Sequence, residues 1–174
     1  VVYSHHLQNT IYPLIVILYA KPKSAFAPLM VIWVGYGLFS KIAIAFLVAF
    51  FPIVVNTVVG LKEVEPELLE LARVNRGSEW DVFKKIRLPN SLPYMFAGIK
   101  VAIVLSVTGA IVAEFVAANE GLGYLVLQAN YNLDTAFALV ILLILAVLSL
   151  GLFWLAELIQ RKLAPWSAAV REVE

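Results

Sequence analysis

The sequence predicts an all-α, polytopic membrane protein, and three observations support this. Hydrophobic residues make up 62% of the 174 residues and charged residues 14%, whereas soluble domains are about half apolar and a quarter charged. The mean hydropathy is +0.90. Apolar runs close to the roughly 20 residues that a helix needs to cross a bilayer recur between polar segments. The chain has no cysteine, so disulfides and thiolate chemistry are not expected.

Four apolar segments are expected to form the spans of a single domain, residues 1–174. The first, residues 11–39, is interrupted by Lys21–Lys23 and is interpreted as one broken span, with a re-entrant turn as the alternative. Pro13, Pro22 and Pro28 mark places in it where the helix loses backbone bonds. The other spans are expected over residues 41–60, 95–118 and 136–159, with a long polar loop over 61–94.

The polar loop is predicted to begin with a short helix from Pro66 to about Asn75. Proline suits the first turn of a helix because its missing N–H is unpaired there anyway. Leu68, Leu69 and Ala72 then fall on one helical face.

A second short helix is predicted after a turn. Gly77 supplies a backbone that can leave the first helix, and Ser78 with Asp81 three residues later reads as a capping box. Pro89 and Pro93 are expected to end the element, because neither continues a helix interior.

At these residues the sequence resembles the membrane-spanning permease subunits of bacterial binding-protein-dependent ABC importers. Their cytoplasmic signature reads approximately E-A-A, three residues, G-A, an aromatic, an aliphatic and Leu-Pro. Aligned on the final Leu-Pro, the signature falls on Glu70, Ala72, Arg76, Gly77, Phe83, Ile86, Leu88 and Pro89. One position departs from the pattern, since Arg76 stands where the family has glycine and the bend is expected one residue later.

The resemblance implies that this loop is a coupling helix that docks on an ATP-binding cassette subunit. A solvated amphipathic loop between two spans is the alternative. The segments PLMVIWVGYG, SKIAIAFLVAFFPIVVNTVVG and AEFVAANEGLGYLV also resemble the nitrate, sulfonate and taurine branch of the importers. That resemblance implies a second permease subunit, expected as a homodimer, an external solute-binding protein, and further spans upstream of a chain that begins mid-protein.

A nitrate, sulfonate or taurine substrate is the first expectation from the resemblance. A thiamine-precursor pyrimidine or a riboflavin-like compound is the alternative. The chain is not expected to be an enzyme, and no cofactor is expected, because ATP hydrolysis would belong to the partner subunit.

Polar and small residues inside the spans are candidates for the solute path. Asn56 needs a hydrogen bond inside the membrane, so it faces other helices or a wet cavity. A carboxylate is costly at Glu114 unless it reaches water or a partner, so Glu114 is interpreted as part of the outer gate, or as solvated at the interface. A stripe of small residues favours helix packing, with a path as the alternative: Ala102, Ser106, Gly109, Ala113 and Ala117.

Basic residues set the predicted orientation. Six of them lie in the polar loop, and Arg161 and Lys162 follow the last span, whereas the connection over residues 120–134 has none. The positive-inside rule therefore places the loop and the C-terminus in the cytoplasm and the connection outside. The resemblance implies that the membrane is a bacterial inner membrane. Lys41 and Lys100 are expected to snorkel to the interfaces, and Gly121 and Gly123 to make turns.

Other function classes find less support. The chain has no GxxxxGK[ST] phosphate loop and no HExxH motif, and a third ligand is lacking near His5 and His6, so no metal site is predicted. The net charge of +1 does not indicate nucleic acid binding. A structural membrane scaffold or an intramembrane enzyme is the competing class, and the latter should show ionisable groups deep in the spans. Membrane lipid is an expected partner in either case.

Overall fold

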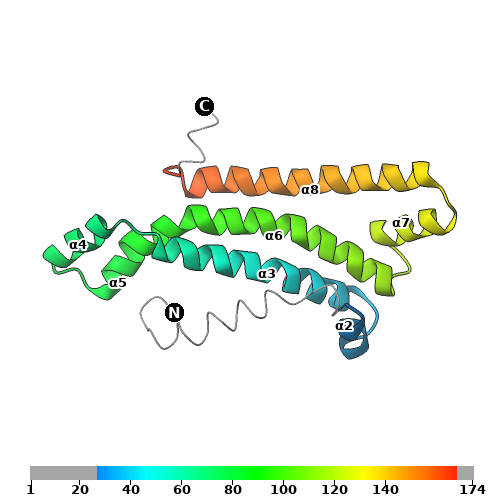
Figure 1. Ribbon diagram of the computed structural model, residues 1–174, viewed down its shortest axis with the longest axis horizontal. Coiled ribbons are helices and arrows are strands. Elements are labelled where there is room, and N and C mark those ends of the chain that lie inside the picture. Colours follow the sequence, from blue (N-terminus) through cyan, green and yellow to red (C-terminus); the bar gives the residue numbers. More distant parts are fainter. Residues whose placement is uncertain (1–26, 168–174) are drawn as a thin grey trace.

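The computed structural model describes residues 27–167, and every regular element in that part of the chain is a helix (Figure 1). This confirms the all-α class. The helices are α2 (Ala27–Val34), α3 (Leu38–Lys62), α4 (Pro66–Val74), α5 (Glu79–Val82), the π-helical segment η2 (Phe83–Arg87), α6 (Leu88–Ala117), α7 (Leu122–Tyr131) and α8 (Thr135–Leu163).

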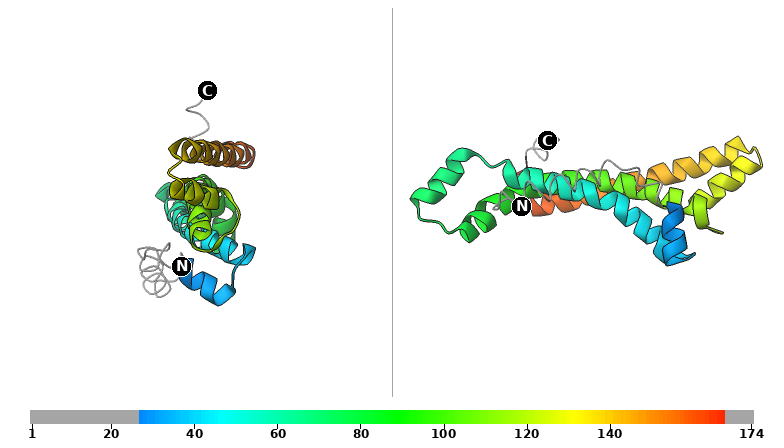
Figure 2. Two further views of the ribbon diagram at one scale, coloured as in Figure 1. Left: turned by 90° about the vertical axis from the view of Figure 1, so that its right-hand side faces the viewer. Right: turned by 60° about the horizontal axis from the view of Figure 1, so that its bottom comes forward.

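Three long apolar helices form the body of the molecule. α6 lies between α3 and α8 and packs against both, and successive long helices run in opposite directions (Figures 1 and 2). Helices over residues 38–62, 79–116 and 135–163 are long and apolar enough to cross a membrane. Most apolar side chains on α8 are exposed, as expected for a helix that faces lipid.

The short helices gather at the two ends of this body. α4 and α5 project from one end, where α8 also finishes, whereas α2 and α7 lie at the opposite end (Figure 1). The polar loop and the C-terminal end of α8 therefore lie on the same side of the spans, in the arrangement that the positive-inside rule requires of them.

The first predicted span, residues 11–39, does not form one helix over the residues that the structure describes. Residues 11–26, with Pro13 and Pro22, lie outside the described residues, as do His5 and His6. α2 ends at Val34, and residues 38 and 39 already belong to α3. Gly35 and Gly37, with φ of 89° and 139°, take conformations that side chains disfavour, so the chain leaves one helix and enters the next within three residues.

The connection predicted over residues 120–134 contains a helix, α7. Gly121 makes a turn with φ of 120°, as expected, but Gly123 lies inside α7, so the prediction of a turn there was wrong. The helix packs against α6 and α8. Its apolar residues, which were read as part of a loop, therefore cover the ends of two spans.

Pro89 and Pro93 do not end the second helix of the polar loop, so the prediction that they would end it was wrong. The helix continues from Glu79 through η2 into α6, and the backbone N–H of Leu88 bonds to the Phe83 carbonyl across the wider π-helical turn. Pro89, the second residue of α6, follows this wider turn and lacks only its own backbone donor. Pro93 lies inside α6 and removes a single backbone bond.

The contact between α3 and α6 depends on small residues. A Cβ added to Gly98 would lie 2.8 Å from the Pro52 carbonyl, and one added to Gly109 would lie 2.9 Å from a Val48 methyl. Ala102 and Ala113 are buried on the same helix. In lipid the hydrophobic effect does not drive helices together, so the van der Waals contacts made at such close approach stabilise the pair instead. In the described part of the chain, small residues of the stripe on α6 therefore pack this helix against α3 within the same subunit.

Candidate functional site

The segment that resembles the importer signature, residues 66–89, is called the coupling segment below. α4 begins with Pro66 at its first position and runs to Val74, as predicted. The capping box is also confirmed, because the backbone N–H of Asp81 donates to Ser78 Oγ at 3.1 Å. Asp81 additionally pairs with Lys85 one turn later, with 2.7 Å between charged atoms.

The turn between α4 and α5 is made at Arg76, and the expectation that Gly77 makes the bend was wrong. Arg76 has φ of 53°, in the left-handed region, and its N–H donates to Arg73 O at 3.0 Å. The N–H of Gly77 donates to Ala72 O at 2.9 Å. These two bonds make a Schellman ending, in which the residue after the cap is usually glycine. Arginine thus occupies the left-handed position that the signature assigns to glycine.

The turn places a cleft between α4 and the second helix of the coupling segment. Its volume is about 340 Å³, and its lining contains four of the eight residues that carry the resemblance. A fifth, Phe83, stacks on Trp80 with the ring centroids 5.6 Å apart. The lining residues are Ala72, Asn75, Arg76, Gly77, Asp81, Val82, Lys85 and Ile86.

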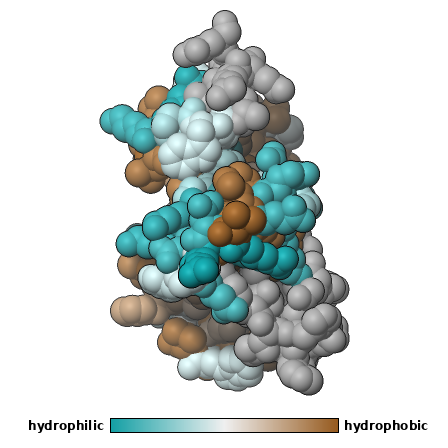
Figure 3. Space-filling model, turned by 90° about the vertical axis from the view of Figure 1, so that its left-hand side faces the viewer, coloured by the Kyte–Doolittle hydropathy of each residue, from teal (hydrophilic) through white to brown (hydrophobic). Residues whose placement is uncertain are grey.

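The outward face of α4 is a separate surface. Glu67, Glu70, Leu71 and Val74 recur at helical spacing and all are exposed, with Leu71 59% and Val74 81% exposed. Trp80 on α5 is 69% exposed. Viewed from this end, apolar side chains stand among hydrophilic ones (Figure 3). An apolar patch rimmed by charge is typical of a protein-binding surface.

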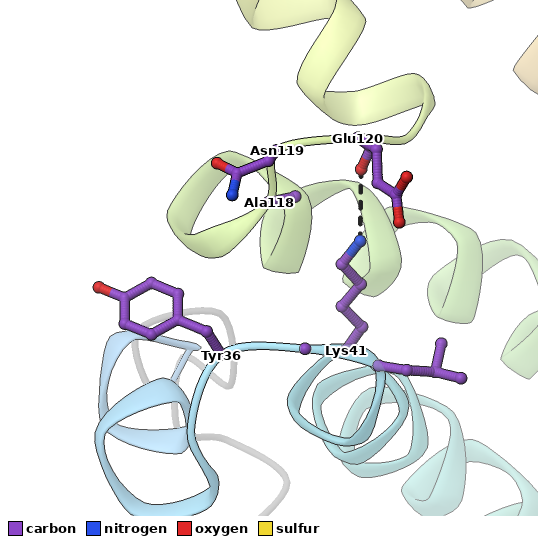
Figure 4. Close-up of a pocket in the computed structure, with 7 residues that line it drawn as sticks. Tyr36, Lys41, Ala118, Asn119 and Glu120 are labelled. Atoms are coloured by element: carbon purple, nitrogen blue, oxygen red, sulfur yellow. Dashed lines mark hydrogen bonds between the residues drawn. The ribbon is translucent and has the colours of Figure 1, made fainter.

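At the opposite end, Glu114 connects three helices. Its Oε2 accepts a hydrogen bond from the Gly123 N–H of α7 at 2.6 Å, and its Oε1 lies 3.7 Å from Lys41 Nζ of α3. Lys41 also donates to the backbone carbonyl of Glu120 at 3.3 Å (Figure 4). The side chains of Lys41 and Glu114 are only 20% and 18% exposed. Lys41 is therefore held by protein contacts, whereas the sequence predicted simple snorkelling.

A cavity of about 520 Å³ adjoins these contacts, between the α2–α3 turn and the end of α6 (Figure 4). The Lys41 side chain reaches from α3 towards the α6–α7 connection, where the Glu120 carbonyl meets it. The cavity is lined by Tyr36, Gly37, Leu38, Lys41, Ala118, Asn119 and Glu120.

The other candidate path residues form mostly local contacts. Asn56 Nδ2 donates to Pro52 O at 2.8 Å and Ser106 Oγ donates to Ile103 O at 2.8 Å, each within its own helix. Gly109 lies against α3. Of the four candidates, Glu114 is the one whose polar group bonds to another helix in the described part of the chain.

An ion pair between Lys100 of α6 and Glu157 of α8 was not anticipated from the sequence. Both side chains are less than one fifth exposed, and Arg161 lies 3.6 Å from Glu157 one turn further along α8. The Lys100 ammonium also lies 5.5 Å from the Phe153 ring. The signal was one acidic residue near the end of an otherwise apolar span, since such a residue needs a partner. Among the described residues, no three potential metal ligands come together.

Comparison with known proteins agrees with these features. Residues 1–165 match the family model described as the binding-protein-dependent transport system inner membrane component. The chain is 38% identical over 94% of its length to the riboflavin transport system permease protein of Chloroflexus aurantiacus, and 34% identical over 94% to the formylaminopyrimidine transport permease protein of Halalkalibacterium halodurans. It spans 61% and 66% of the lengths of these two relatives. Permeases for aliphatic sulfonates, taurine and nitrate match at 31% to 33% identity.

The fold is also similar to that of a solved transporter structure. A chain in an inward-facing structure of the MetNI methionine ABC transporter matches with a TM-score of 0.76, over 94% of this chain and 78% of that one, at 21% identity. The family model covers nearly the whole chain, and the resemblance of the coupling segment agrees with it. The chain belongs to the inner-membrane components of binding-protein-dependent ABC transport systems.

Proposed function

We propose that this chain forms the membrane-spanning permease part of an ATP-driven importer, in which an external binding protein delivers a small solute and a separate subunit hydrolyses ATP. The observation that carries the proposal is the coupling segment. It projects from one end of the spans and carries exposed apolar side chains on a helix whose sequence matches the family signature. A scaffold protein has no need of such an element.

The coupling segment offers two features to an ATP-binding subunit. The outward face of α4 presents Leu71 and Val74 beside the carboxylates of Glu67 and Glu70. The cleft behind α4 is open to a side chain of the partner. Apolar anchors with a charged rim are the usual composition of a protein interface. We therefore assign docking to this face, with Glu70 as its central charge.

The opposite end is proposed to be the outer gate. Glu114 holds α3, α6 and α7 together through two contacts, so the three helices would separate only if these contacts break. This orientation follows from the basic residues of the coupling segment and of α8, which would lie in the cytoplasm. A second permease subunit, identical to this one, would complete the path.

The relatives suggest two classes of substrate, because some are named for heterocyclic solutes and others for anions. We propose a riboflavin-like or pyrimidine solute first, because Lys41 and Lys100, the basic residues inside the spans predicted over residues 41–60, 95–118 and 136–159, are both paired with carboxylates. An anion crossing a membrane needs an unpaired counter-charge. Nitrate, a sulfonate or taurine is the second candidate, supported by the relatives that carry those names.

Co-purification and ATPase assay of the full-length protein, expressed with its neighbouring genes, test the proposal. An ATP-binding subunit should co-purify, and Glu70→Ala or Gly77→Ala should reduce the stimulation of ATP hydrolysis by the binding protein while leaving membrane insertion intact. Lys162→Ala is the control, since Lys162 is an exposed charge on α8 outside the coupling segment. A protein that purifies without any ATPase contradicts the importer function. Unchanged stimulation in Glu70→Ala contradicts the assignment of the docking face, and unchanged stimulation in Gly77→Ala contradicts a role for the cleft.

Binding of candidate solutes identifies the substrate separately. The neighbouring binding protein is titrated with riboflavin, a formylaminopyrimidine, taurine and nitrate. Saturable binding of either heterocycle supports the first candidate, and binding of an anion alone supports the second.

A further inference from the structure

The C-terminal end of α3 is bonded to the start of α6 through two side chains. Asn90 Nδ2 donates to Gly60 O at 3.0 Å and to Glu63 O at 2.7 Å, and Arg87 Nη1 donates to Leu61 O at 2.8 Å. The last carbonyls of a helix have no partner within it and need one elsewhere. Here the partners come from residues 26 to 30 positions later in the chain.

Two further features bring these groups together. Gly60 lies directly against Tyr94 of α6, since a Cβ on Gly60 would lie 2.7 Å from the Tyr94 side chain. Arg87 is the last residue of the π-helical segment η2, whose extra residue per turn changes the direction of the side chains that follow it. Single turns of π-helix inside α-helices are frequent at functional sites.

We propose that Arg87 and Asn90 form a clamp that makes α3 and α6 move as one unit when the coupling segment is displaced. The inference rests on the proposed function. Residues 63–65, which join α3 to α4, are not helical. A movement of α4 is therefore not passed to α3 along a rigid helix. The second helix of the coupling segment, by contrast, is continuous with α6. The clamp passes the movement of α6 to α3 through three hydrogen bonds and the Gly60–Tyr94 contact.

Neither residue is assigned to the docking surface. Asn90 follows the coupling segment, and Arg87 is partly buried with its guanidinium directed to α3. Both are positioning residues, because they act through helices that they join. Their loss should therefore leave assembly intact and change how the two helices respond to nucleotide.

Spin-label distances in the assembled complex test the clamp. The printed sequence has no cysteine, so Phe46→Cys on α3 and Val104→Cys on α6, both exposed positions, introduce one label on each helix. With the clamp intact, the distance between the labels should stay constant between the nucleotide-free and the ATP–vanadate states. With Asn90→Leu it should differ by about 2 Å or more between these states, the scale of helix shifts in switching proteins.

Further variants distinguish loss of the clamp from a defect in folding or assembly. Asn90→Gln retains an amide donor and should keep the distance constant, whereas Arg87→Met, which removes the donor to Leu61 O, should behave like Asn90→Leu and serves if that variant fails to assemble. Thr108→Val is the control, because the Thr108 hydroxyl donates within its own helix, to Val104 O at 3.1 Å, and not to α3 in the part of the chain that the structure describes. A constant distance in Asn90→Leu and Arg87→Met complexes that assemble and hydrolyse ATP overturns the clamp alone. Failure of the unaltered chain to assemble with an ATPase contradicts the proposed function instead.

Discussion

Glu114 of α6 and Gly123 of α7 are joined by a hydrogen bond of 2.6 Å between a carboxylate oxygen and a backbone N–H. A carboxylate near the end of a membrane span is thereby bonded by one neighbouring helix and paired by Lys41 of another. The carboxylate of Glu114, which was costly for a membrane span in the sequence, therefore joins α6 to both α3 and α7 at this end of the molecule.

Removing the Glu114 carboxylate should destabilise the protein. We expect Glu114→Ala to lower the free energy of unfolding by about 2–3 kcal/mol, because it leaves the Gly123 N–H without its acceptor and the partly buried Lys41 with only the Glu120 carbonyl. Glu114→Gln retains an acceptor for Gly123 and should cost about 1 kcal/mol less. Thermal unfolding in detergent measures both. Glu120→Gln is the control, since Lys41 contacts the backbone of Glu120, and equal losses in all three variants would contradict this account.

Replacing Arg76 by glycine should stabilise the coupling segment. Arginine in the left-handed conformation is strained, and relief of this strain is expected to contribute about 1 kcal/mol. Protection of the α4 amides from hydrogen exchange should increase accordingly. Arg73→Gly, inside the last turn of α4, should have the opposite sign and cost about 1 kcal/mol, because glycine is a poor helix former. Reduced protection in Arg76→Gly would show that the arginine side chain stabilises the turn.

The Lys100–Glu157 pair should show strong coupling between its members. Lys100→Met alone should cost about 3 kcal/mol, because it leaves the largely buried Glu157 carboxylate with only the more distant Arg161, at 3.6 Å, as a partner. The double variant Lys100→Met with Glu157→Met should recover most of that loss. Arg161→Gln removes the more exposed neighbour and should cost less than about 1 kcal/mol. Thermal unfolding of the unaltered protein, of each single Met variant and of the double variant gives the coupling energy, and additive losses would exclude a direct pair.

Helical glycines should differ according to their neighbours. Gly109→Ala should cost about 1–3 kcal/mol, since the added methyl meets Val48 at 2.9 Å and forces α3 and α6 apart. Gly151→Ala is the matched control, because nothing lies within 4 Å of its added Cβ, and alanine there should stabilise α8 by up to about 1 kcal/mol. Unfolding in detergent compares them. A Gly109→Ala variant as stable as the unaltered protein would mean that the two helices tolerate a wider separation.

The local chemistry of the sequence predicted much of the helical architecture. Long apolar runs can satisfy their backbone groups in lipid only as helices, and three of the predicted spans overlap helices that are long and apolar enough to cross a membrane. Pro66 and the Ser78–Asp81 capping box are local signals, and both lie where they were predicted. The resemblance of residues 70–89 gave the family before any contact was known, and the family model agrees with it.

Tertiary structure decided the features that depend on distant partners. Lys41 and Lys100 were expected to reach water, but Glu114 and Glu157, which are distant from them in the sequence, hold them within the protein. The π-helical segment carries the chain past Pro89, which by local rules should have ended the helix.

The sequence by itself therefore determined that the chain is a helical membrane protein with a projecting polar element, because hydropathy and capping act over a few residues. Which charges pair, where Arg76 bends the chain, and how Arg87 and Asn90 bond to the end of α3 were decided only by the packing of the helices. Ion pairs and carbonyl contacts form between residues that the fold brings together, and one-dimensional patterns carry no information about those distances.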